Sequence, residues 1–171
     1  MEFQLDHPNI FYVQAAQGWL DLGNPAEARE ELKHIEPALA LHPAVLETRF
    51  QIAAQEKHWN EALEIGRQLK QITPEEPASW IHEAFALHEL KRTQEAWDAL
   101  LPAAGKFPKV SLIPYNLACY ACQLGRSDEA RKLLRFAMQI GDAKEVRRMA
   151  MSDRDLEPLW GELGEDKLKG P

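Results

Sequence analysis

Apolar residues recur along this chain with the spacing of amphipathic helices. One stripe consists of Ala28, Leu32, Ile35 and Leu39, and another consists of Leu133, Leu134 and Ala137. Steps of three or four residues place successive side chains on one face of a helix, and that face must be buried against a neighbour. The chain is therefore predicted to be all helical.

The helical pattern repeats at a fixed interval. A Glu-Ala pair occurs at Glu27-Ala28, Glu61-Ala62, Glu95-Ala96 and Glu129-Ala130, each pair 34 residues after the last. Such regular recurrence indicates an array of one helix-turn-helix unit. The punctuation agrees, because Gly23-Asn24-Pro25 ends one helix and begins the next, and Pro74 and Pro108 close later units.

This frame predicts the helix bounds and the domain organisation. Helices are expected over residues 9–22, 43–56, 59–72, 77–90 and 93–106, and Pro37 is expected to kink or end the second helix. We predict one domain over residues 1–171, with repeats at 9–42, 43–76, 77–110 and 111–142. Residues 143–164 should form helices that cap the last apolar face, and residues 165–171 should be frayed.

Each repeat carries certain residue types at fixed positions. The third repeat has Trp80 early in its first helix, Ala84 in mid-helix, Ala96 in the second helix and Pro108 at its close. This pattern resembles the tetratricopeptide repeat (TPR) family over about residues 9–142. The resemblance implies an all-α, right-handed α-α superhelix, or solenoid, in which the first helix of each repeat lines a concave surface that binds proteins.

The second repeat departs most from the family pattern. Phe50 stands where a small residue is usual, and Gly66 stands where a large apolar one is usual. Since cores tolerate rearrangements that conserve volume better than voids, we expect the Phe50 ring to fill the space that Gly66 leaves.

Composition narrows the functional classes. With 171 residues and 45% hydrophobic content, the chain is long enough for one ordinary core. The 20 Lys and Arg against 27 Asp and Glu, a net charge of -7, disfavour nucleic acid as a partner. The N-terminus shows neither a basic start nor a long apolar run, so no secretion signal or membrane insertion is expected and the predicted location is cytoplasmic.

No motif predicts a metal, cofactor or catalytic site. Cys119 and Cys122 have CxxC spacing but lack a second ligand pair, so two reduced, buried or groove-lining thiols are expected. His82 and His88 are six residues apart, a rotation of about 240° on a helix, and cannot share an ion. The remaining histidines are scattered and form no predicted ligand cluster: His7, His34, His42 and His58. The protein is therefore not expected to be an enzyme.

The resemblance assigns a candidate peptide-binding groove to the first helices. Its residues are Val13, Gln17, Asp21, Glu47, Gln51, Ile81, His82, Phe85, His88, Glu89, Tyr115, Asn116 and Cys119. Packing between helices is an equal alternative for Phe85 and Tyr115. The groove is neutral to acidic, with imidazole and aromatic groups in the middle, and is expected to suit an apolar or mildly basic peptide.

One TPR subclass holds the acidic tails of chaperones in a two-carboxylate clamp of Lys, Asn and Arg. The matching positions here are Val13 and Gln17, Thr48, and Ala78 with His82. Without cations the charge-assisted hydrogen bonds are lost, so the clamp is not predicted.

Three roles remain open. The leading prediction is a non-enzymatic interaction module or scaffold that binds a protein or peptide. The alternatives are a small chaperone-like TPR protein that shields an apolar client, and a protein whose C-terminal segment folds into its own groove. Charge is uneven, with nine acids and four bases in residues 1–60 and eight bases and five acids in residues 126–154. This unevenness is either ordinary surface variation or a basis for weak self-association.

Overall fold

The computed structural model describes residues 5–164, and every regular element in that range is a helix. The predicted all-α class is confirmed. The chain divides into two compact units, residues 1–86 (unit 1) and residues 87–171 (unit 2), which are described in turn. Within the described range, no helix is both long and apolar enough to cross a membrane.

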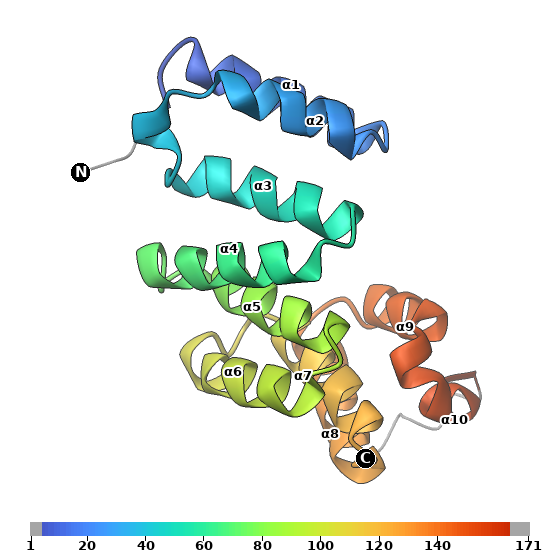
Figure 1. The fold of residues 1–171 in the computed structure, drawn as a ribbon. Coiled ribbons are helices and arrows are strands. Elements are labelled where there is room, and N and C mark those ends of the chain that lie inside the picture. Colours follow the sequence, from blue (N-terminus) through green and yellow to red (C-terminus); the bar gives the residue numbers. More distant parts are fainter. Residues whose placement is uncertain (1–4, 165–171) are drawn as a thin grey trace. The chain divides into compact units, whose positions relative to one another are not determined.

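Unit 1 consists of successive helical hairpins (Figure 1). The elements are α1 (Asn9–Asp21), α2 (Pro25–Glu31), α3 (Pro43–Gln55), α4 (Trp59–Ile72) and most of α5 (Pro77–Glu89). The predicted bounds of α3, α4 and α5 are confirmed to within one residue. The helices α3 and α5 begin where the sequence predicts because each has Pro at its first position, where the missing N–H is not needed.

The second helix of the first repeat is shorter than the stripe predicts. The α helix ends at Glu31 and gives way to two 3-10 turns, η1 (Leu32–His34) and η2 (Pro37–Leu39). Glu36 is extended, with ψ of 134°, because a residue before proline avoids the helical region. Asn9 bridges this break, since its Oδ1 accepts from the Glu36 N–H at 3.1 Å and its Nδ2 donates to the Glu36 carboxylate at 3.1 Å.

The predicted apolar stripe nevertheless forms the core of this end of unit 1. The buried cluster consists of Val13, Ala16, Leu20, Ala28, Leu32, Ile35, Val45 and Ile52. Leu39 packs against this cluster while remaining partly exposed. The 3-10 turns therefore preserve the burial of the stripe although the α helix does not continue through it.

A close approach of two backbones explains Gly66. A Cβ atom at this position would lie 2.9 Å from the Glu83 backbone nitrogen of α5. The α5 backbone occupies the space that Gly66 leaves, so the expectation that the Phe50 ring fills it is wrong. Phe50 is buried instead against His82, with the two rings stacked at 4.0 Å between centroids.

Unit 2 contains the remaining helices (Figure 1). They are α6 (Thr93–Lys106), α7 (Leu112–Gln123), α8 (Ser127–Ile140), α9 (Ala143–Ser152), η3 (Arg154–Leu159) and α10 (Trp160–Gly164). α7 packs against α6, α8 and η3, and nine of its twelve residues are buried. Leu156 and Leu159 of η3 and Leu163 of α10 are each at most 1% exposed, so the apolar side chains of these two elements are buried within unit 2. The tail predicted to fray, residues 165–171, lies outside the described residues.

The turn between paired helices has one backbone geometry throughout. A left-handed residue recurs every 34 positions, at Gly23, Lys57, Lys91 and Gly125, with φ of 72°, 58°, 64° and 75°. Glycine adopts this region freely, whereas an L side chain is disfavoured there by about 1 kcal/mol. Lys57 and Lys91 therefore indicate that the packing of each hairpin determines the left-handed backbone at this position, even for a residue type that disfavours it.

Candidate functional site

α1 brings two of its three predicted groove residues to the surface. Gln17 and Asp21 are exposed. Val13 is only 5% exposed and belongs to the apolar cluster of unit 1. Val13 is therefore a core residue in the structure, and the accessible predicted groove residues of α1, Gln17 and Asp21, are polar, while Phe11 of the same helix is 58% exposed.

The adjoining surfaces of α3 and α5 meet in a hydrogen-bonded pair. The His82 Nε2 atom lies 2.8 and 2.9 Å from the two carboxylate oxygens of Glu47. Gln51, which is exposed, donates its Nε2 hydrogen to the same carboxylate at 3.4 Å. Burial opposes ionisation of Glu47, but the hydrogen bonds and charge of His82 prevail and lower its pKa. Glu47 is thus a fixed, ionised group.

The apolar members of the unit 1 surface are partly withdrawn from solvent. Phe85 meets Trp59 of α4 edge to face, with 5.5 Å between ring centroids. Ile81 and Phe85 are both half-buried. The packing role that the sequence left open for Phe85 is therefore present, while part of its ring stays accessible.

In unit 2 the predicted groove residues are covered by the chain itself. His88, Tyr115 and Cys119 are each at most 5% exposed. The covering residues are Asp153–Leu156, which we call the acidic segment. Only Glu89 and Asn116 of the predicted unit 2 residues remain partly exposed.

Four side chains donate hydrogen bonds to the acidic segment. The Tyr115 hydroxyl and the Cys119 thiol both point to Oδ2 of Asp153, at 2.9 and 3.5 Å. The Nε2 atom of His88 lies 2.7 Å from Oδ2 of Asp155. The Gln123 amide, exposed at the end of α7, donates to the Asp155 backbone carbonyl at 3.1 Å. The acidic segment is therefore held by groups of the predicted groove.

The ionisation of these donors is set by burial. Burial is the main cause that raises the pKa of the Tyr115 hydroxyl and of the Cys119 thiol, and the neighbouring Asp153 carboxylate raises both further. Both groups consequently keep their protons at neutral pH and act as donors. Cys119 and Cys122 are free, buried thiols, in line with the packing role predicted for them.

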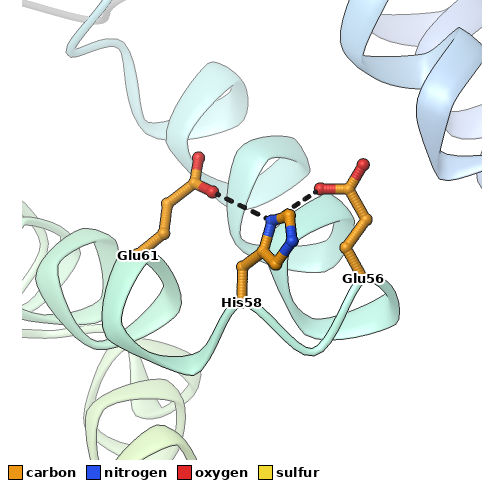
Figure 2. A group of neighbouring side chains, drawn as sticks. All are labelled: Glu56, His58 and Glu61. Atoms are coloured by element: carbon orange, nitrogen blue, oxygen red, sulfur yellow. Dashed lines mark ion pairs between the residues drawn. The ribbon is translucent and has the colours of Figure 1, made fainter.

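One histidine predicted to be isolated belongs to a cluster. Figure 2 shows the His58 ring between the carboxylates of Glu56 and Glu61, with Nδ1 at 3.2 and 3.7 Å. The three residues could each offer a ligand atom, all within 4.8 Å of one another. The prediction that His58 joins no such cluster is wrong, because the turn between α3 and α4 brings these residues together.

A cation of the protein already pairs with both carboxylates of this cluster. The Arg29 guanidinium of α2 donates to Glu61 at 2.8 and 3.0 Å and to Glu56 at 3.2 Å. The hydrogen bond from Arg29 is the main cause that lowers the pKa of Glu61. The cluster therefore serves as an ion-pair link between the first and second helical hairpins. Sequence reasoning missed it because Arg29 is 27 and 32 residues from its partners.

Comparisons with known proteins identify the fold. No protein-family model matches the chain, and no curated protein matches it. Solved structures do match. TTC0263, a thermophilic TPR protein of Thermus thermophilus, has 20% identity and a TM-score of 0.74, covering 94% of this chain and 85% of that one.

Two further solved structures show the same likeness. MamA AMB-1 has 17% identity and a TM-score of 0.66, covering 91% of this chain and 99% of that one. A Podosopora anserina protein described as a kinesin light chain with nearly identical TPR-like repeats has 21% identity and a TM-score of 0.67, covering 96% and 91%. At these identities the likeness concerns the fold, and it agrees with the sequence prediction.

Proposed function

We propose, from the tetratricopeptide repeat fold of this chain, that it is a non-enzymatic protein-interaction module whose partner surface is the first-helix face of unit 1. The observation that carries the proposal is the exposure of Gln17, Asp21 and Gln51 on α1 and α3. In unit 2 the position that corresponds to Gln17 and Gln51 is Cys119, which is buried and donates to the acidic segment. A partner therefore has access to the first-helix face of unit 1.

The charge of this surface supports a basic peptide as the ligand. The helices α1 and α3, which form this face, carry two acids, Asp21 and Glu47, and one base, Arg49. Asp21 is exposed and Glu47 is held ionised beside Gln51. Lysine or arginine side chains of a partner would meet both carboxylates and amide oxygens there.

The test is a peptide selection followed by a matched pair of variants. A random peptide library displayed on phage is selected on the full chain, and the sequences recovered should be enriched in Lys and Arg. Asp21→Lys with Gln51→Lys should weaken a selected peptide by at least about tenfold, because each change opposes a cationic ligand. Asp98→Lys, a charge reversal at an exposed position of α6, should leave binding unchanged. Recovery of acidic sequences, or equal binding by both variants, would refute the proposal.

A further inference from the structure

The acidic segment occupies the first-helix face of unit 2 in the manner of a bound peptide. Tyr115, Cys119 and Gln123 are spaced four residues apart and so lie on one side of α7. Each points a donor at residue 153 or residue 155. His88, from the end of α5, completes the set. A row of donors on one helix face thus meets a row of acceptors on one short segment.

The chemistry of this face selects anionic groups at a fixed spacing. Four donors converge on two carboxylates that are two residues apart and on the backbone carbonyl of Asp155. Hydrogen bonds to carboxylates are stronger than those to neutral acceptors, so amide side chains would be poorer ligands. The face is specific for the spacing of the two carboxylates as well as for their charge, because Asp153 and Asp155 accept hydrogen bonds from different donors.

Two features of the segment add to this recognition. The Asp153 Oδ1 atom accepts a hydrogen bond from the Asp155 N–H at 3.0 Å, so the segment folds on itself where it meets α7. Leu156 directly follows the second carboxylate and is fully buried. The sequence that the face accommodates is therefore Asp-x-Asp-Leu.

We infer that the face formed by α7 and the end of α5 is a recognition site for an acidic peptide of the form Asp-x-Asp-Leu, which residues 153–156 of this chain occupy in cis. A partner that carries such a sequence binds there by displacing the chain's own segment. This site lies in unit 2 and differs in charge preference from the basic-peptide surface of unit 1, so either can fail without the other.

The test weakens the internal ligand and supplies it again as a separate molecule. The probe is a fluorescent peptide with the sequence of residues 152–160, added to the full chain. Asp153→Asn with Asp155→Asn should raise its affinity at least about tenfold over wild type, because two charge-assisted contacts of the internal competitor are lost. A control peptide with both aspartates replaced by asparagine should not bind.

Two more measurements locate the binding and guard against misfolding. Adding Tyr115→Phe to the double variant should abolish the gain, whereas adding Gln17→Ala in unit 1 should not. Should circular dichroism show the double variant unfolded, wild type decides the question: excess peptide should then speed amide hydrogen exchange over residues 153–159. The inference is overturned by a folded double variant that ignores the peptide, by equal binding of the asparagine peptide, or by exchange that the peptide leaves unchanged.

Discussion

The first-helix faces of the two units use the same repeat positions and differ in what lies over them. Gln17 and Gln51 of unit 1 are exposed, whereas Cys119, at the same repeat position in unit 2, is buried and donates to the acidic segment. The hairpin scaffold alone cannot account for this difference, since it places these residues equivalently. The difference comes from Asp153–Leu156, which follow α9 and cover the first-helix face of unit 2.

The largest expected effect comes from the apolar anchor of the covered face. Leu156→Ala should lower the free energy of unfolding by about 2–5 kcal/mol, because Leu156 is fully buried and its loss leaves a cavity. Chemical denaturation of the full chain measures this. Leu22→Ala is the control, since Leu22 is 76% exposed and its truncation should change little. Equal effects of the two changes would show that the acidic segment is only loosely attached.

The next prediction concerns the ion-pair link of unit 1, in which Arg29 joins the first helical hairpin to the second. Arg29→Gln should destabilise the protein by about 1–2 kcal/mol, because Glu56 and Glu61 lose a shared partner while solvent screens part of the loss. Thermal denaturation and hydrogen exchange over α2 measure the effect. Arg92→Gln, which removes the surface pair with Glu95, is the control and should leave the midpoint in place. If hydrogen exchange over α2 were unchanged in Arg29→Gln, the apolar stripe alone would be enough to hold α2 in place.

A smaller effect is expected from the left-handed lysines, one in each unit. Lys57→Gly and Lys91→Gly should each stabilise the protein by about 0.5–1 kcal/mol, because glycine adopts positive φ without strain. The reciprocal change Gly125→Lys should destabilise it by a similar amount. Denaturant midpoints provide the comparison. If only one of the two substitutions stabilised the protein, the two turns would not be equivalent. The first-helix faces of the two units would then differ in their backbone geometry as well as in what covers them.

The smallest effect concerns acid pH in unit 1. The pKa of Glu47 is below its ordinary value of 4.5. Its contribution to stability is therefore full above pH 4.5 and is lost as the pH falls through the lower, folded-state pKa. Glu47→Gln should flatten the fall in stability between about pH 5 and pH 3 by a few tenths of a kcal/mol. Glu64→Gln, an exposed change on α4, should retain the wild-type slope. If stability depended on pH in the same way for both variants, the pairing of Glu47 with His82 would not contribute to acid sensitivity.

The 34-residue frame predicts much of the fold because its signals are local. The bounds of α3, α4 and α5 follow from prolines, turn residues and apolar spacing within each segment. At α2 the frame correctly predicts the break at Pro37, but it does not predict that the α helix ends at Glu31 or that the Asn9 side chain binds Glu36 from 27 residues away. The close backbone approach at Gly66 is also not predicted, because it depends on a contact with Glu83 of α5, outside the local sequence around Gly66.

The candidate surface was predicted less completely than the fold. Helical register identified Tyr115, Cys119 and His88 as members of one face, and the structure brings them together on the acidic segment. Helical register does not predict that the acidic segment covers these residues, because Asp153 is 38 residues from Tyr115 in the sequence. Contacts at such distance depend on how the C-terminal helices fold back, which no periodicity in the repeats encodes.

Gly66 has a consequence for how this protein can change over generations. Its missing side chain lets the α5 backbone come within 2.9 Å of where a Cβ would stand. Any other residue would force the backbones of α4 and α5 to shift relative to each other. A substitution at this one buried position could therefore alter how α5 packs in unit 1 while every exposed residue stayed the same.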